Sequence, residues 1–220
     1  MGSSKKLTGK LLESYKKSLT LTKQQQDVLI GTVLGDANIR FFKKGAILTI
    51  SHSEKQLDYV LWKYNIFHDW VLTKPQKEIR VYYKDKTRNL TSWRFSTVSH
   101  PIMAKYYHLF YSKGKKCIPN QIGSFLKSPL ALAVWFMDDG SRKPYGRGAF
   151  LHTQSFSIND QKKLIKMLKK NYSIEARLSS AGLYKGKRLY RLYITAKSFP
   201  VFRNLVLPYL LDSMQYKISL

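Results

Sequence analysis

Two aspartates, Asp36 and Asp139, are the residues whose type and spacing most directly suggest chemistry. Each follows an apolar run, residues 29–35 and 132–137, with the composition of a tightly packed helix. A carboxylate at the C-terminal end of a helix has the unfavourable sign for the helix macrodipole, by about 0.3–1 kcal/mol. We therefore expect each acid to have another role. A divalent cation would provide one, since carboxylates and helix-end carbonyls both offer oxygen ligands.

The identity of that cation follows from the donor chemistry. Hard oxygen ligands without a cysteine cluster favour Mg²⁺, and we expect Mn²⁺ to substitute for it. Two acids brought together by neighbouring helices could stabilise the attacking and leaving oxygens of a phosphodiester. Gly31 and Gly35 lie four residues apart on one face of the first run. This spacing predicts close approach by another backbone, because glycine in a helix interior costs about 0.5–1 kcal/mol relative to alanine.

The overall charge points to a polyanionic partner. The 220 residues include 39 Lys and Arg but only 13 Asp and Glu, for a net charge of +26. The surplus divides into +11 for residues 1–110 and +15 for residues 111–220, so it is not confined to a tail. Nucleic acid is the leading candidate for the partner. With 44% hydrophobic residues the chain also has material for a real core, which excludes a disordered basic tail.

Several classes of protein are excluded by composition. A single cysteine, Cys117, rules out an internal disulfide framework and cysteine-based zinc fingers, and it is typical of a reducing intracellular compartment. The sequence contains no run of about 18 apolar residues, so no transmembrane helix is expected. The histidines lack zinc-site spacing, and the sequence contains neither a phosphate-binding glycine loop nor a nucleophile elbow.

The periodicity predicts the same order of elements twice, helix, strands, helix, strands, helix. In the first half, after a peripheral basic helix over residues 5–19, we expect a helix from Thr22, strands over 46–51, 79–84 and 92–97, and helices over 54–72 and 100–111. Thr22 with Gln25, and Ser53 with Gln56, have the spacing of capping boxes. Residues 86–89 are predicted to form a basic hairpin loop.

The second half repeats this order. We expect helices over residues 128–140, 157–171 and 198–211, and strands over 149–153, 173–180 and 188–195. Pro129 after Ser128, Ser157 and Gly140 are predicted helix boundaries. Residues 112–127 are predicted to be a linker. The resulting domains are a basic extension (1–21), a first subdomain (22–111), the linker (112–127) and a second subdomain (128–220).

Individual residues also repeat along the chain. Asp36 and Asp139 lie 103 residues apart, His52 and Gln154 lie 102 apart, and Lys116 and Lys217 lie 101 apart. Offsets that drift near 100 are typical of an old duplication. The segments LIGTVLGDA (29–37) and LAVWFMDDG (132–140) both resemble the nine-residue LAGLIDADG motif. The chain therefore resembles a monomeric, two-motif LAGLIDADG homing endonuclease from about residue 22 onward.

The resemblance implies an α+β fold of two pseudo-symmetric αββαββα subdomains, whose saddle-shaped antiparallel sheets bind DNA in the major groove. It implies that Asp36 and Asp139 bind Mg²⁺, and that Lys116 and Lys217 stabilise charge or position water. Gln154 matches a polar active-site position, and His52 is its counterpart in the first half. Departures from the motif, such as Asp138 at its seventh position, make the halves unequal, and we assign Asp138 a polar helix-end role.

Strand side chains would then read DNA bases, while phosphates supply much of the affinity. Arginine is the best guanine reader because it pairs bidentately with O6 and N7. The candidates for DNA binding are Arg40, Arg80, Tyr82, Lys84, Arg88, Arg94, Arg147, Arg177, Lys187, Arg188 and Arg191.

The resemblance further implies hydrolysis of both DNA strands at a long, asymmetric site, with 3′ overhangs. It implies an intron-encoded protein, in a mitochondrion or chloroplast if the host is eukaryotic. Two alternatives remain open on the same scaffold. One is an intron RNA maturase, and the other is a catalytically inactive DNA-binding protein.

Overall fold

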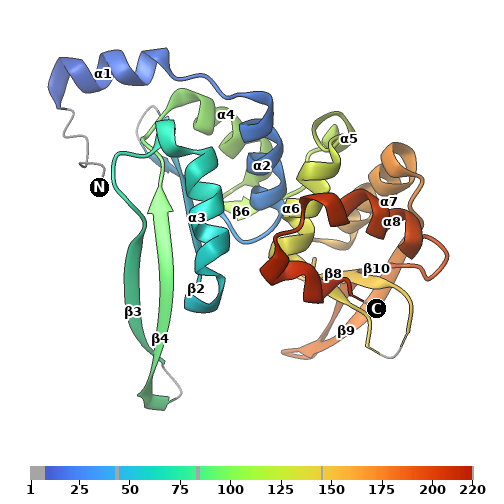
Figure 1. Cartoon of the computed structure of the whole chain (residues 1–220). Coiled ribbons are helices and arrows are strands. Elements are labelled where there is room, and N and C mark those ends of the chain that lie inside the picture. The colour runs from blue at the N-terminus through green and yellow to red at the C-terminus, as the bar shows by residue number, and fades with distance from the viewer. Residues whose placement is uncertain (1–7, 43–44, 83–84, 145, 220) are drawn as a thin grey trace. The chain divides into compact units, whose positions relative to one another are not determined.

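A computed structural model describes residues 8–42, 45–82, 85–144 and 146–219 of the chain (Figure 1). The chain forms two compact units, each built from two stretches of sequence. One unit contains residues 1–26 and 36–107, and the other contains residues 27–35 and 108–220. The helix that carries the first aspartate motif, α2 (Lys23–Leu34), therefore begins in the first unit and ends in the second.

The first unit is an antiparallel sheet with helices. Its strands are β1 (Asn38–Phe42), β2 (Gly45–Ser53), β3 (Gln76–Tyr82) and β4 (Asp85–Ser96), hydrogen-bonded in the order β1-β2-β4-β3. Its helical segments are α1 (Gly9–Ser18), the start of α2, η1 (Glu54–Gln56), α3 (Leu57–Ile66), η2 (His68–Trp70) and most of α4 (Pro101–Phe110). Figure 1 shows α3 beside the sheet and β3–β4 as a long two-stranded ribbon.

Alternation along the strands gives this sheet one buried and one open face. Ile39, Leu48, Ile50 and Phe95 are all buried, and they face the helices of the unit. Successive strand residues point to opposite faces, so the polar residues between them lie on the other side. The open face therefore carries Arg40, Arg80 and Arg94.

Local sequence signals for the helix starts have mixed outcomes in this unit. The capping box at α2 is confirmed: the Thr22 amide donates to Gln25 Oε1 at 3.0 Å, and the Gln25 amide donates to Thr22 Oγ1 at 3.2 Å. The second predicted box is wrong, because Ser53 makes no side-chain cap bond. There the chain first forms the 3₁₀ turn η1, and the predicted helix over residues 54–72 is divided into η1, α3 and η2.

The predicted loop at residues 86–89 is also wrong. These residues belong to β4, in which Asp85 pairs with Tyr82 and Asn89 pairs with Val81. The ladder shifts register between Val81 and Tyr82, so that the additional residues of β4 are accommodated within the strand. Turn-forming composition alone could not reveal this irregularity.

The second unit repeats the sheet topology of the first. Strands β7 (Gly140–Arg142), β8 (Ala149–Leu151), β9 (Ala176–Tyr184) and β10 (Lys187–Ile194) are antiparallel in the order β7-β8-β10-β9. Its further elements are α6 (Pro129–Asp139), α7 (Ile158–Tyr172), α8 (Phe199–Val206), η3 (Leu207–Tyr209) and η4 (Asp212–Lys217). The predicted α+β class and the repeated order of elements are therefore confirmed.

The segment that connects the two sheets in sequence, predicted as a linker, contains regular elements. It contains a small hairpin, β5 (Tyr111–Ser112) with β6 (Lys115–Lys116), and the short helix α5 (Ile122–Phe125). Asn171 of α7 anchors α5, because its side-chain amide donates to the carbonyls of Gly123 and Leu126 at 2.8 Å each. Across the described ranges, no helix has the length and apolarity needed to cross a membrane.

Helix α6 lies in the core of the second unit, and α2 packs closely against it. Residues 131–137 of α6 are all fully buried, as expected for a helix that is apolar on every side. Gly31 of α2 lies so close to α6 that a Cβ added there would be 2.5 Å from the carbonyl oxygen of Ala131. A Cβ added at Gly35 would be 2.3 Å from the Cβ of Asp138. The glycine pair of the first motif is therefore a close-packing site, as the sequence predicts.

Replacing Gly31 with alanine should destabilise the protein by about 1–3 kcal/mol, the usual cost of overpacking. The new Cβ would meet a backbone oxygen and, at 2.7 Å, the Cβ of Val134, neither of which can rotate away. Unfolding in urea, followed by circular dichroism, measures the loss.

Gly123→Ala is the matched control. The nearest atom to a Cβ at Gly123 is 3.8 Å away, an ordinary contact, so this variant should be as stable as the parent or slightly more stable. Equal losses for the two variants would contradict the packing argument.

Candidate functional site

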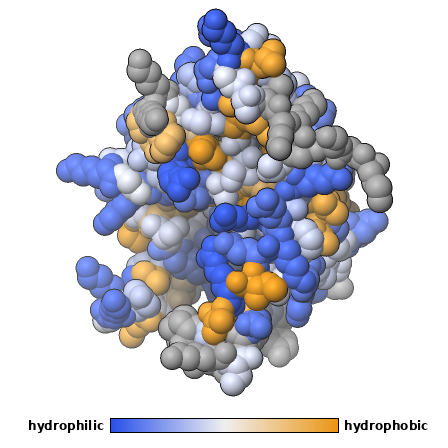
Figure 2. Space-filling model, turned by 90° about the vertical axis from the view of Figure 1, so that its left-hand side faces the viewer, coloured by the Kyte–Doolittle hydropathy of each residue, from blue (hydrophilic) through white to orange (hydrophobic). Residues whose placement is uncertain are grey.

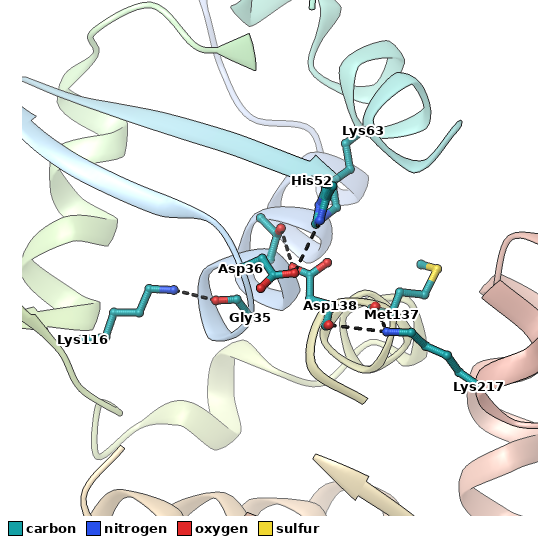
Figure 3. Close-up of polar contacts among 9 residues, drawn as sticks. Gly35, Asp36, His52, Lys63, Lys116, Met137, Asp138 and Lys217 are labelled. Atoms are coloured by element: carbon teal, nitrogen blue, oxygen red, sulfur yellow. Dashed lines mark hydrogen bonds and ion pairs between the residues drawn. The ribbon is translucent and has the colours of Figure 1, made fainter. Parts of the chain in front are cut away.

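Asp36, within the first motif, makes a polar contact with His52. Asp36 follows the C-terminal end of α2, and His52 lies near the end of β2. His52 Nδ1 is 3.5 Å from Asp36 Oδ2 (Figure 3). The histidine side chain is only 2% exposed, whereas the Asp36 side chain is 44% exposed. The carboxylate is thus held from inside the unit and remains accessible to a cation from solvent.

Lys63 lies behind His52. Its Nζ is 3.1 Å from His52 Nε2 and 4.1 Å from the centre of the Tyr59 ring, and the residue is fully buried. Sequence reasoning missed Lys63. A signal was present, because Tyr59, Lys63 and Phe67 are spaced by four residues on the buried stripe of the α3 segment. A lysine on such a stripe indicates a specific buried partner.

Lys116 lies at the end of α2. Its Nζ donates to the carbonyl of Gly35 at 2.7 Å, within the second unit. The last carbonyls of a helix have no partner inside the helix, and a cation there also interacts favourably with the macrodipole. Lys116 therefore offsets part of the cost of placing an acid, Asp36, immediately after this helix.

Lys217 occupies the equivalent position at α6. Its Nζ donates to the carbonyl of Met137 and lies 3.5 Å from the carbonyl of Asp138. Asp138 accepts a hydrogen bond from Thr32 Oγ1 of α2 at 2.9 Å, and its side chain packs against Gly35. Asp138 thus takes part in the contact between the two helices.

The surroundings of Asp139 come from the second sheet. The carbonyl of Asp139, the last residue of α6, accepts from the amide of His152 at 2.8 Å. His152 Nε2 lies 2.9 Å from Ser141 Oγ. Burial, followed by the positive charges of Arg191 and Lys217, lowers the pKa of His152 from its ordinary value. Gln154 is half-buried in the turn that follows β8.

The open face of the first sheet forms a polar groove. It is lined by Asn38, Arg40, Thr49, Ser51, Glu78, Arg80, Arg94 and Ser96. The fold thus gathers three of the predicted DNA-binding arginines from three different strands. Glu78 holds two of them: Arg80 Nη2 is 2.9 Å from Oε2, and Arg94 Nη1 is 3.4 Å from Oε1. Sequence reasoning missed this acid, although a glutamate within a basic strand was visible.

On the open face of the second sheet, basic side chains lie over aromatic rings instead of pairing with an acid. Arg177 and Lys143 lie 5.2 and 5.1 Å from the centre of the Tyr193 ring, and Arg191 lies 3.6 Å from that of Phe150. Such cation–π contacts limit the motion of the side chains and leave their charge in place. Lys143 was missed because it lies in the segment that follows β7, outside any predicted strand.

The remaining candidates lie outside these two groups. Arg147, Lys187 and Arg188 are exposed in the second unit, and Tyr82 is half-buried in β3. Lys84 and the side chain of Arg88 fall outside the described residues. Figure 2 shows the side of the molecule on the left of Figure 1, where hydrophilic residues surround small, separate hydrophobic groups. The structure therefore brings together some predicted residues, above all Asp36 with His52 and the arginines of the first groove.

Comparison with known sequences gives a consistent result. The model of the LAGLIDADG DNA endonuclease family matches residues 26–202. The chain is 30% identical over 204 residues to cytochrome b mRNA maturase bI2 of Debaryomyces hansenii, which covers 90% of the chain and 75% of the relative. It is also 30% identical over 213 residues to DNA endonuclease I-ChuI of Chlamydomonas applanata, which covers 91% of the chain and 97% of the relative.

Solved structures agree with the sequence comparisons. The homing endonuclease I-WcaI bound to its DNA recognition sequence superposes with a TM-score of 0.85 at 30% identity, covering 96% of this chain and 93% of that one. A complex of I-DmoI with its target DNA has a TM-score of 0.51 at 12% identity, covering 85% and 97%. The second likeness shows the fold alone, and both confirm the α+β architecture.

The lowered pKa of His152 predicts how stability depends on pH. A depressed folded-state pKa means that the unfolded chain, with a histidine pKa of about 6.5, binds the proton more readily. The contribution of His152 is therefore complete above that pH and is lost as the pH falls below it. His152→Gln should lose less stability than the parent between pH 7.5 and pH 5.5 in urea unfolding.

An NMR titration of the His152 ring checks the cause directly. The midpoint should lie below the ordinary histidine value. A midpoint above that value would show that the two cations and burial do not govern this ring.

Proposed function

Because this chain belongs to the LAGLIDADG DNA endonuclease family, we propose that it is a homing endonuclease that hydrolyses both strands of a long, asymmetric DNA site and leaves 3′ overhangs. The observation that carries the proposal is the extent of the relationship. The likeness to the DNA-bound homing endonuclease covers 96% of the chain at 30% identity, so it includes both aspartate motifs and both sheets.

Mg²⁺ is the proposed cofactor, with Mn²⁺ as a substitute. Asp36 fits a hard divalent cation, because its carboxylate is an oxygen ligand that is open to solvent and supported from behind by His52. Asp139 is the corresponding ligand in the second half. When bound, such a cation neutralises phosphate charge and lowers the pKa of water.

The chain's own residues have the following proposed roles. Lys116 and Lys217 keep positive charge at the ends of the two motif helices, where each carboxylate would meet a scissile phosphate. His52 orients Asp36, and Gln154 is a polar group of the second half that positions water. Because the first half has a histidine where the second half has a glutamine, we expect unequal cleavage rates for the two DNA strands.

DNA would bind along the open faces of the two sheets. Arginines of the first groove could pair with base edges or phosphates, and those of the second sheet are pre-oriented on aromatic rings. The net charge of +26 supplies the sequence-independent attraction. The protein is proposed to act as a monomer, since one chain contains both motifs.

A second function, assistance to intron RNA splicing, is favoured by one specific observation. One relative at 30% identity is named a cytochrome b mRNA maturase, and its alignment covers 90% of this chain. We further propose that the host intron lies in an organellar gene, in a mitochondrion or a chloroplast. Splicing of the host intron with and without the protein tests this role. A protein that binds DNA with Mg²⁺ but does not cut would instead indicate a catalytically inactive DNA-binding protein.

Asp36→Asn and Asp139→Asn test the nuclease assignment. Each should lower the cleavage rate at least about 100-fold, since a catalytic cation contributes several kcal/mol, while DNA affinity is retained. Cleavage of the target duplex and a gel-shift assay provide the two measurements. Asp58→Asn, which removes an exposed carboxylate of α3, is the control. Cleavage at the parental rate by either test variant would remove that aspartate from the site.

Glu78→Gln tests the proposed DNA face. The carboxylate neutralises part of the charge of Arg80 and Arg94, so its loss should free both guanidinium groups for phosphate contacts. We expect tighter binding to non-cognate duplex and a slope of log affinity against log salt that is steeper by about 1–2. Glu54→Gln is the matched control, because Glu54 pairs with Lys77 at 2.8 Å and does not line the groove. An unchanged slope for Glu78→Gln would place the DNA elsewhere.

A further inference from the structure

The buried lysine of α3 requires an explanation. Lys63 is fully buried, and removing an ammonium group from water is costly unless specific partners compensate for it. One partner is the face of Tyr59, whose ring centre lies 4.1 Å from Nζ. This geometry is that of a cation–π contact. The second partner is the ring of His52.

The chemistry of that second contact constrains the histidine. An ammonium group has three donors and no acceptor, so the nitrogen that faces it must be unprotonated. The facing nitrogen is His52 Nε2, at 3.1 Å. A neutral imidazole must then carry its proton on Nδ1. That nitrogen is the one that lies 3.5 Å from Asp36 Oδ2.

The ring also has little freedom to rotate away from this arrangement. Tyr59 lies against it, with ring centres 4.9 Å apart and planes inclined by 37°. Figure 3 shows the resulting line of groups, from Lys63 on α3 through His52 to Asp36 after α2. Only the last member of this line is open to solvent.

We propose that Lys63 is a positioning residue, which holds His52 in its Nδ1–H form so that the ring donates to Asp36 and does not itself bind a cation. This inference rests on the proposed function for the role of Asp36. Binding of a cation by Nδ1 would require a proton on Nε2, facing the Lys63 ammonium donor to donor. The lysine thus leaves Asp36 as the cation ligand of this pair, with one carboxylate oxygen oriented by His52.

NMR of the free protein tests the inference without DNA or a cation. In protein labelled with ¹⁵N-histidine at pH 8, long-range ¹H–¹⁵N spectra distinguish protonated from unprotonated ring nitrogens, and His52→Gln assigns the signals. We expect His52 to have a protonated Nδ1 and an unprotonated Nε2. The opposite tautomer would overturn the proposal, and this measurement needs no variant of Lys63.

Lys63→Met then tests the cause. The variant should shift His52 toward the Nε2–H form and lower the cleavage rate about 10–100-fold at unchanged DNA affinity, the usual effect of removing a group that orients a metal ligand. Lys55→Met is the control, since Lys55 is an exposed lysine just before α3. A folded Lys63→Met protein with the parental tautomer would overturn the proposal. If the parent shows the Nδ1–H form but does not cut DNA, the proposed function fails while the assignment of Lys63 stands.

Discussion

The close contact between α2 and α6 is the constraint on which the rest of the structure depends. Glycine at position 31 allows α2 to approach the backbone of α6, and a Cβ there would come 2.5 Å from the Ala131 carbonyl oxygen. The contact also determines where the motif residues at the end of α2 lie. Gly35 packs against Asp138, and Thr32 donates to the Asp138 carboxylate. A side chain at position 31 or 35 would therefore displace the end of α2 that precedes Asp36.

The ends of the two motif helices also pose an electrostatic problem that the fold solves twice. An acid after a helix C-terminus is unfavourable, and the last carbonyls need donors. Lys116 and Lys217, from segments remote in sequence, each donate to such a carbonyl. The two helix ends are alike in their lysine contacts but differ in what surrounds each aspartate. Asp36 has the buried His52 beside it, whereas the carbonyl of Asp139 accepts from the backbone of His152.

The two sheets restrain their arginines by different means. On the first sheet, Glu78 forms ion pairs with Arg80 and Arg94, which keeps part of the charge neutralised. On the second, Tyr193 and Phe150 lie under Arg177 and Arg191, which orders the guanidinium groups without neutralising them. The greater positive charge of residues 111–220 fits this difference. The two sheets therefore present chemically distinct surfaces.

Residues whose role depends on their neighbours in the chain were predictable from sequence alone. The glycines of α2, the capping box at Thr22 and the order of helices and strands all express local periodicity or short spacing. The sequence could not reveal contacts that depend on register and burial. Lys63 beneath His52, Glu78 between two arginines and the extension of β4 through residues 86–89 result from how distant segments pack. The physical reason is that a side chain's burial and hydrogen-bond partners are set by the elements that cover it, and only the tertiary structure decides which elements those are.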